Sequence, residues 1–580
     1  MAESPPSIRA IEAENNRHPL SDPQACRDWL ARVPAADPLA GVRTICAALD
    51  RIPGRGSFVA LTVLETLRTQ AARLLDALAD RYADKALPLS DPQRMALDAS
   101  DGLARQLANL CAESIAPCIA APPEYRRYAA LLHQRAIFWI VQSVIQQSRA
   151  RQRVPDTLWQ SAREAMRSAQ RLGLADAPVR DSLQPGGQSS VSAIYARALL
   201  IGLCGARSLT AREFEYACQI ACDFERKIVV IPAEAADQVK RSKSVRLGGI
   251  AQTLDVDALA TSLGGRLAAL NRGQEIESPI LSPPATPQAL KGLIGKLYGA
   301  WCGRANQRKF PRRARQQTVF CAFDPENIYA LMKRRPYIAP PAPKLYSHQE
   351  VANIFLTQKD VPFQGQGHTP ETWQHVLATL DQWRLIEESA TGMSMRRQIG
   401  FARVRRGQLA AIRLGKDGTA MVGEVRWTEQ IGVDDSSVEL GLEMLPGLAR
   451  AGAARHADRS SITRVAGNLH STAALILDNF SRGNRAGPGA HPGQTSRNSA
   501  IGGIFEAISL PDIDADLVDQ KEAAPSRRYS ERATVVLPAG WAQQGNEIDF
   551  IDGPAARRLR LGTVAARHGE FERMYFTVIA

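Results

Sequence analysis

The chain has 580 residues, of which 45% are hydrophobic, with a formal net charge of +13 and an isoelectric point near 9.5. This length and hydrophobic content are enough for about three to four folded domains, and they exclude a disordered chain. The positive charge favours an anionic partner (nucleic acid, nucleotide, acidic lipid or acidic protein), although a GC-rich genome explains the excess of Arg over Lys equally well.

We expect neither a targeting segment nor a membrane span. Residues 1–6 lack the basic and apolar regions of a signal peptide. The most apolar run, Ala136 to Ile145, is too short to cross a bilayer. The nine cysteines form no CxxC motif, and no His partners lie near Cys218 and Cys222. The sequence therefore predicts a reduced, cytoplasmic protein without a metal site.

Residues 23–303 are predicted to form one helix after another. Apolar residues recur at three- and four-residue spacing, and Ser90-Asp91-Pro92 has the composition of a helix start. No fixed period is present, so a named solenoid repeat is not supported. We expect an irregular helical scaffold that either presents a surface to other proteins or packs against the rest of the chain. The predicted helices span Pro38–Leu49, Phe58–Tyr82, Ser90–Leu110, Tyr125–Arg149, Asp156–Leu172, Ala193–Leu203, Thr210–Ile228, Val256–Leu270 and Pro287–Trp301.

Two short segments interrupt this helical pattern. The run Ile228–Ile231 has the composition of a buried strand. The segment Lys240–Arg246 then carries four basic residues and no acidic one. Such a run usually forms a solvated face, and contact with a ligand is the less common alternative.

The composition changes at residue 303. The run from Gly303 to Arg315 is strongly basic, holds no acidic residue and leads into a predicted strand at Gln317–Phe323. We expect a helical insertion at about residues 325–382 before the next strands. These lie at Trp383–Met395 (two strands joined by a small-residue turn), Leu409–Leu414, Ala420–Thr428 and Val438–Leu445. Short β-segments bounded by Gly and Asp are typical of a small antiparallel barrel.

The last part of the chain is predicted to be rich in β-structure. Strand-like runs lie at Leu469–Leu477, Ala533–Pro538, Glu547–Ile551, Arg557–Ala565 and Phe571–Ile579, with turns between them. They indicate either a second small β-module or an extension of the first barrel. Arg557, Arg558 and Arg560 would give this part a basic edge.

Two motifs on the predicted barrel resemble those of the PilZ family of cyclic di-GMP receptors. That family carries an RxxxR motif before its first strand and a (D/N)xSxxG motif at a later strand and turn. Here Arg308-Lys309-Phe310-Pro311-Arg312 matches the first motif, and Ser389-Ala390-Thr391-Gly392 matches the second through Ser and Gly. Glu387 stands where the family has Asp or Asn, and the insertion before it is longer than a PilZ loop. The resemblance covers residues 304–445.

This resemblance implies a barrel that binds cyclic di-GMP, with a site built from Arg308, Arg312, Arg313, Glu387, Ser389 and Gly392. Arg suits such a ligand because its planar fork grips a phosphate and also stacks on, or donates to, a guanine. A Ser hydroxyl donates to an oxygen, and Gly permits close backbone approach. The alternatives are a solvated linker for the Arg-rich segment and an ordinary turn between two strands for Ser389–Gly392.

The sequence as a whole predicts an α+β protein without catalytic activity. The GxxxxGK[ST], HExxH and GxSxG motifs are absent, so no NTPase, zincin or α/β-hydrolase site is expected, and no cofactor. The predicted domains are a helical scaffold at residues 1–303, a PilZ-like barrel at 304–450 and a β-rich module at 465–580. We expect a cytoplasmic cyclic di-GMP receptor that signals to a protein partner. A nucleic-acid-binding regulator, or a PilZ-like adaptor that binds no nucleotide, are the alternatives.

Overall fold

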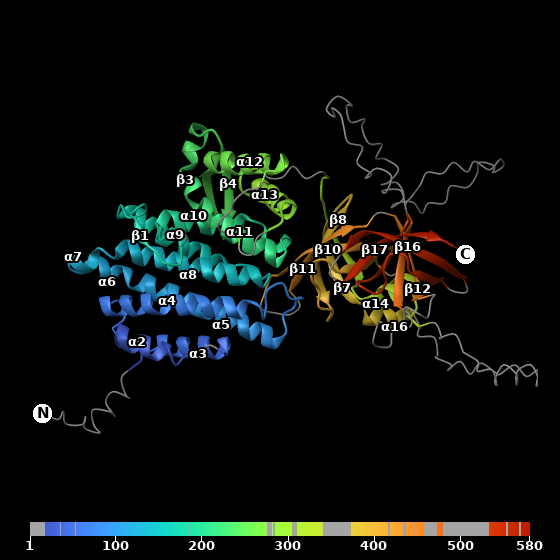
Figure 1. The fold of residues 1–580 in the computed structure, drawn as a ribbon, viewed down its shortest axis with the longest axis horizontal. Coiled ribbons are helices and arrows are strands. Elements are labelled where there is room, and N and C mark those ends of the chain that lie inside the picture. Colours follow the sequence, from blue (N-terminus) through green and yellow to red (C-terminus); the bar gives the residue numbers. More distant parts are fainter. Residues whose placement is uncertain are drawn as a thin grey trace, which may run out of the picture. The chain divides into compact units, whose positions relative to one another are not determined.

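The computed structural model describes residues 18–579 except for 35, 53, 185, 275–280, 282–284, 304–309, 340–372, 416–417, 433–436, 446, 457–471, 479–532, 553–554 and 568–569. The described residues form two compact units (Figure 1). The first comprises residues 1–323 and 377–444, and the second comprises residues 324–376 and 445–580.

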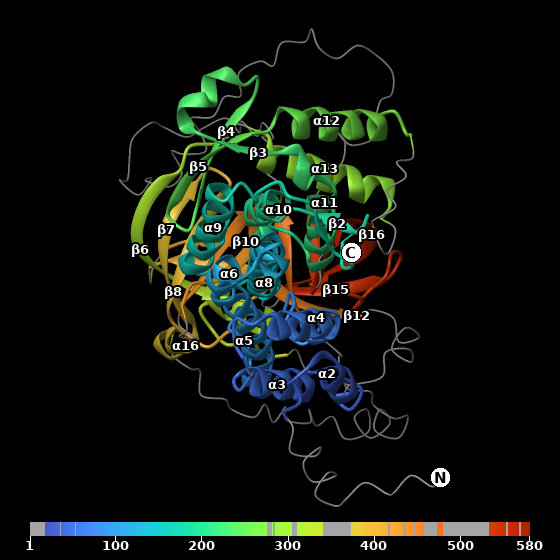
Figure 2. The ribbon, with the colours of Figure 1, turned by 90° about the vertical axis from the view of Figure 1, so that its left-hand side faces the viewer.

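The first unit begins with a stack of helices. Their order is α2 Pro23–Leu30, α3 Pro38–Leu49, α4 Phe58–Ala79, α5 Asp91–Glu113, α6 Ile115–Ala120, α7 Pro123–Arg126, α8 Ala129–Arg149, α9 Asp156–Arg171, α10 Val191–Leu203, α11 Ala211–Phe224, α12 Asp257–Asn271 and α13 Pro287–Trp301. Helix α8 lies in the middle and packs against α5, α9 and α10 (Figure 2). It is buried on nearly every side, including the polar His133, Gln134 and Arg135. The predicted helical scaffold is thus present.

Local sequence explains where several of these helices begin. The Asp22 side chain accepts hydrogen bonds from the Gln24 and Ala25 backbone N–H groups at the start of α2. At α11 the Thr210 hydroxyl accepts from the Glu213 backbone, and the Glu213 carboxylate accepts from Thr210 N–H in return. Such caps satisfy backbone donors that have no partner inside the helix.

A small antiparallel sheet is inserted between α11 and α12. It contains β3 Val229–Ile231, β4 Ser242–Leu247 and β5 Ile250–Asp255 in the order β3-β5-β4. The prediction of a buried strand at Ile228–Ile231 is wrong in one respect: β3 is an edge strand, and Val229 is 58% exposed. In the basic segment, Lys243 Nζ donates to the carbonyls of Ala300 and Gly303 at the end of α13. This lysine therefore caps a helix end.

The first β-barrel completes the first unit. Its strands are β6 Arg313–Ala322, β7 Asp381–Ser389, β8 Gly392–Ile399, β9 Leu409–Leu414, β10 Ala420–Gln430 and β11 Val438–Met444. They close in the order β10-β11-β8-β7-β6-β9, and every neighbouring pair is antiparallel. The predicted barrel is therefore present. Strand β6 begins at Arg313, four residues before the predicted start, so Arg313 belongs to the barrel wall.

Backbone hydrogen bonds join the helices to this barrel. Leu87 and Val404, both fully buried, exchange N–H···O bonds of 2.8 Å in each direction. At the end of β10, Gln430 N–H donates to Arg151 O, and Arg153 N–H donates to Gln430 O, both at 2.9 Å. The buried apolar side chains of helices and barrel form one continuous cluster. The barrel and the helical scaffold therefore share a hydrophobic core.

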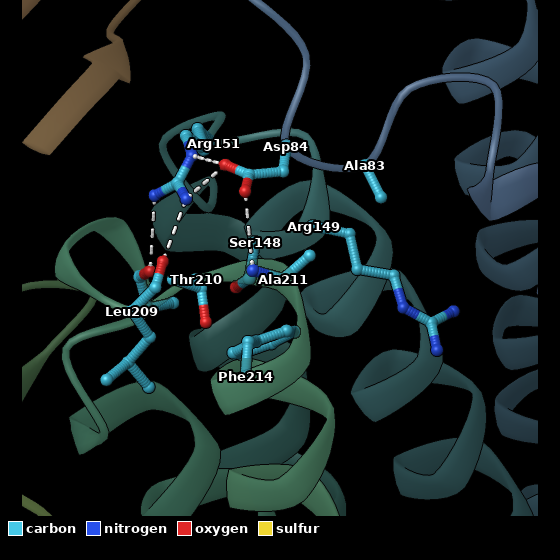
Figure 3. Close-up of a pocket in the computed structure, with 10 residues that line it drawn as sticks. Ala83, Asp84, Ser148, Arg149, Arg151, Leu209, Thr210, Ala211 and Phe214 are labelled. Carbon is cyan, nitrogen blue, oxygen red and sulfur yellow. Dashed lines mark hydrogen bonds and ion pairs between the residues drawn. The ribbon is translucent and has the colours of Figure 1, made fainter. Parts of the chain in front are cut away.

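Arg151 organises this junction on the helical side (Figure 3). Its backbone is left-handed, with φ +55°, as is that of Asp84, with φ +53°. The Arg151 guanidinium, which is almost fully buried, donates to the Asp84 carboxylate and to the carbonyls of Arg207 and Leu209. The hollow beside them has room for about one water molecule.

The second unit is built around another closed barrel. Its strands are β12 Leu448–His456, β13 Thr472–Asp478, β14 Thr534–Pro538, β15 Glu547–Asp552, β16 Ala555–Arg567 and β17 Phe571–Val578. They close in the order β12-β13-β14-β17-β16-β15. When the strands of each barrel are numbered from its own first strand, both barrels have the order 1-2-3-6-5-4. The β-rich end of the chain is thus a barrel of its own rather than an extension of the first.

The predicted helical insertion is divided between the units. Helix α14, Pro325–Lys333, follows β6 in the chain but packs on β12 and β13 of the second barrel. Lys333 forms an ion pair there with Asp552. Helix α16, Trp373–Thr379, ends earlier than predicted, because β7 already begins at Asp381. The predicted α+β fold class is confirmed, and the three predicted domains, as units that fold alone, stay a prediction.

Candidate ligand site on the first barrel

The pairing of β6 with β7 brings the two sequence motifs together. Arg313 lies opposite Glu388, and Ala314 lies opposite Glu387. Strand β7 then ends at Ser389, which pairs with Gly392 across the turn into β8. Arg312, which immediately precedes β6, therefore lies beside this turn, although it is 75 residues before Glu387 in the sequence.

Two arginines of this segment form ion pairs with β7. Arg312 Nη1 lies 2.7 Å from Glu387 Oε2, and Arg315 Nε lies 2.8 Å from Glu388 Oε1. The side chains of Arg312 and Glu387 are 36% and 38% exposed, so both remain open to solvent. Exposed pairs of this kind contribute only about 0.2–1 kcal/mol each to stability. The arginines are therefore held loosely enough to exchange partners.

Both motif residues, Ser389 and Gly392, make contacts within the barrel itself. The Ser389 hydroxyl donates to Gly392 O at 3.1 Å, and Met444 N–H donates to Thr391 O at 2.9 Å. A Cβ atom on Gly392 would lie 2.6 Å from the Leu442 carbonyl oxygen of β11. Glycine is thus required here by the neighbouring strand, whatever else approaches the turn.

A third ion pair lies on the other side of the turn. Glu443 on β11 is the register partner of Gly392. Its Oε2 lies 2.9 Å from Arg426 Nε on β10, and Arg426 also contacts Glu424 at 3.1 Å. The turn is therefore flanked by three glutamates, each already bound to an arginine.

The structure brings together five of the six predicted site residues. Arg312, Arg313, Glu387, Ser389 and Gly392 all lie at this end of the barrel, and Arg312 contacts Glu387 directly. The sixth, Arg308, lies outside the described residues.

Sequence reasoning did not select Arg315, Arg426 or Glu443 as site residues. Arg315 follows Arg313 by two positions, the spacing that returns to one face of a strand, and that spacing was available from the sequence. Arg426 and Glu443 come close only through the β10–β11 register, which the sequence alone does not give.

This arrangement is suited to binding a phosphate-bearing ligand. Guanidinium groups from two directions reach one exposed end of the barrel, and arginine binds phosphate with two parallel hydrogen bonds. A polar turn with a hydroxyl stands between them.

The cysteines and the possible metal ligands of the described residues can be considered in turn. All nine cysteines are free, and burial raises the pKa of Cys111 to about 12 and that of Cys222 to about 11, which leaves their thiols protonated. No group of three or more His, Cys, Asp or Glu side chains is placed to hold a metal among these residues. The absence of catalytic activity stays a prediction.

Among the described residues, no helix has the length and apolar character needed to cross a membrane. The cytoplasmic location stays a prediction.

Comparison with known proteins gives one match, which lies in the helical part of the chain. Residues 24–233 match the family model described as "Cyclic-di-GMP receptor FimW, N-terminal domain". No curated protein matches the chain. The matched residues run from α2 to the end of β3 and so exclude the barrel. The resemblance to cyclic di-GMP receptors, predicted from the barrel motifs, is thereby confirmed from a different part of the molecule: over residues 24–233 the chain is similar to the N-terminal domain of a cyclic di-GMP receptor.

Proposed function

We propose that the protein is a receptor for cyclic di-GMP, that the nucleotide binds at the Ser389–Gly392 end of the first barrel, and that binding is relayed to a protein partner. The observation that carries this proposal is the β6–β7 register, which sets Arg312 and Arg313 beside that turn. The match of residues 24–233 to a receptor's N-terminal domain supports the same ligand independently.

The chemistry of the ligand fits these side chains. Cyclic di-GMP has two phosphates and two guanines, so it needs cationic groups and hydrogen-bonding edges together. Arg308, Arg312 and Arg313 would grip phosphates or stack on guanine. Ser389 would supply a hydroxyl, while Glu387 would stand at the edge of the ligand. No step in this binding requires a cofactor or a chemical reaction.

The relay would pass through the shared core of helices and barrel. The barrel is joined to the helices by the Leu87–Val404 and Arg151–Gln430 backbone contacts, so a change in its strands acts directly on the scaffold. Helical arrays commonly present surfaces to other proteins, and the partner is proposed to bind there.

Isothermal titration of the full chain with cyclic di-GMP tests the proposal. We expect saturable binding that Arg312→Ala weakens about ten- to a hundredfold, because a charge-assisted hydrogen bond contributes roughly 1.5–3 kcal/mol. Ser389→Ala, which removes a neutral hydrogen bond, should have a smaller effect. Arg557→Ala removes an exposed arginine from the second barrel and serves as the control for net charge.

Three results would contradict the proposal. Equal small losses in all three variants would mean that the ligand responds only to net charge. No measurable binding by the wild type would favour a PilZ-like adaptor without nucleotide. Tighter binding to long single- or double-stranded nucleic acid, with a steep salt dependence, would favour the nucleic-acid-binding alternative.

A further inference from the structure

The arginines proposed to bind the nucleotide already have partners. Arg312 is bound to Glu387 at 2.7 Å, Arg315 to Glu388 at 2.8 Å and Arg426 to Glu443 at 2.9 Å. Each glutamate lies within two residues of Ser389 or directly opposite Gly392. A phosphate that approaches the turn therefore meets carboxylates in the positions where its own oxygens would bind.

Carboxylate and phosphate compete for the same guanidinium face. A planar carboxylate and a tetrahedral phosphate each present two oxygens that can accept two parallel N–H bonds from Arg. The Arg312 N–H that donates to Glu387 is not available to a ligand oxygen while this contact lasts.

We propose that Glu387 is an internal competitor of the ligand: it holds Arg312 in the empty site, and the nucleotide phosphate must displace it. This inference rests on the proposed function and adds to it the element that sets affinity. Glu387 is then a specificity-determining residue. A ligand with one weakly charged group gains too little binding free energy from Arg312 to displace Glu387. A ligand with two phosphates gains enough to offset the loss of the Arg312–Glu387 ion pair.

The neighbouring pairs extend the same arrangement. Glu388 and Glu443 hold Arg315 and Arg426 on either side of the turn, so all three arginines are positioned while the site is empty. This also keeps the guanidinium groups close to the barrel end, where a ligand needs them. The glutamates therefore lower the affinity for any anion and raise the selectivity for a multiply charged one.

Glu387→Gln tests the inference, because glutamine keeps the size and the hydrogen-bond acceptor but removes the charge. In isothermal titration of the full chain, Glu387→Gln should bind cyclic di-GMP about two- to fivefold more tightly than the wild type, the range given by an exposed ion pair. It should also gain affinity for the singly charged linear dinucleotide GpG, which narrows the selectivity for cyclic di-GMP.

Glu439→Gln is the matched control. Glu439 lies on the same strand as Glu443 and pairs with Arg396 of β8 at 2.7 Å, but it is four residues farther along, about 13 Å from the turn. The substitution removes the same charge and the same kind of pair. We expect it to leave the affinity for cyclic di-GMP unchanged.

Combining Glu387→Gln with Arg312→Ala identifies the mechanism. If Glu387 acts by holding Arg312, its substitution should have little effect once Arg312 is absent. An equal gain with and without Arg312 would overturn the competitor role, and so would equal gains from Glu387→Gln and Glu439→Gln. Weaker binding by Glu387→Gln would show that Glu387 contacts the ligand instead. If wild type and variants all fail to bind, the proposed function itself fails, and this inference with it.

Discussion

Ser389 and Gly392 both have structural roles in the first barrel, independent of any ligand. The sequence predicts that Gly392 permits close approach of a nucleotide and that Ser389 forms a hydrogen bond to it. In the structure, Gly392 faces the Leu442 carbonyl, and the Ser389 hydroxyl donates to the backbone of the turn. Both roles favour the same residue types, so the sequence does not separate a structural role from a ligand-binding one, and the ligand role of Ser389 and Gly392 stays a prediction.

Substitution of Gly392 tests its role in the barrel. Gly392→Ala places a methyl group 2.6 Å from Leu442 O, so β8 and β11 must move apart. We expect a loss of about 1–3 kcal/mol in the free energy of unfolding, as is usual for overpacking. Gly102 lies on the exposed side of α5 with open space around it. Gly102→Ala should instead stabilise the protein by about 0.5–1 kcal/mol.

Denaturant unfolding of both variants measures these changes. If Gly392→Ala and Gly102→Ala changed the free energy of unfolding equally, the steric argument for Gly392 would be wrong. The comparison also shows how to interpret ligand binding: loss of cyclic di-GMP affinity in Gly392→Ala alone does not establish a contact with the ligand.

Strands and helices were predicted well where the chain has a simple period. The helices of the scaffold lie within a few residues of their predicted ranges, because an apolar face recurs at helical spacing. The strands β9, β14 and β15 lie equally close to theirs, because short apolar runs bounded by turn residues mark both ends. The sequence missed β12, the pair β4 and β5, and the early start of β6. In β12 the alternating residues are mostly alanine, so hydrophobic contrast along the strand is weak.

The sequence did not predict which elements pack against one another. Helix α14 is an insertion of the first barrel by its position in the chain, yet it packs on the second barrel. The apolar face formed by its buried Ile328 and Leu331 is visible in the sequence, but which surface covers it is decided by tertiary contacts. For the same reason the ion pairs of the candidate site appeared only with the strand register.

We expect His456, at the end of β12, to make the stability of the second barrel depend on pH. Its ring stacks on Trp541 with centroids 4.1 Å apart, and Nε2 donates to Trp541 O at 3.0 Å. Nδ1 is buried without a hydrogen-bond partner. Burial lowers the pKa of His456 below its usual value of 6.5, because a proton on Nδ1 would be left unsatisfied.

The direction of the pH effect follows from linkage. The unfolded chain binds a proton at His456 more readily than the folded barrel does. The stabilisation is therefore complete above about pH 6.5, and it decreases as the pH falls towards the lowered folded pKa. We expect backbone amides of β12 and β14 to exchange faster at pH 5.5 than at pH 7.5, after correction for intrinsic exchange, and His456→Gln to reduce this difference. His133, whose pKa is also lowered by burial, lies in the first unit, so separate peptides distinguish the two. An unchanged pH response in His456→Gln would rule out this histidine as the cause.

At the scale of the whole molecule, the helices and the first barrel behave as one body. They share a continuous core, two sets of backbone bridges and the buried Arg151 junction. The sequence suggested a boundary at residue 303, where the composition becomes basic. That boundary marks a change of secondary structure, whereas the hydrophobic core continues across it. The second barrel has a core of its own.

A substitution at the helix–barrel junction should therefore weaken both parts together. Leu87 is fully buried, and it is joined to Val404 of the barrel by two backbone hydrogen bonds. Leu87→Ala leaves a cavity there and should cost about 2–5 kcal/mol of unfolding free energy. Hydrogen exchange followed by mass spectrometry should show faster exchange in α4, α5, β9 and β10, with β14 to β17 unchanged.

Leu537→Ala is the reciprocal variant, because Leu537 lies in the core of the second barrel. It should accelerate exchange in β14 to β17 and leave the helices and the first barrel at wild-type rates. If Leu87→Ala instead affected only α4 and α5, the scaffold and the barrel would unfold separately, and the boundary suggested by composition would be the correct one. A relay from nucleotide to scaffold would then have to pass through something other than a shared core.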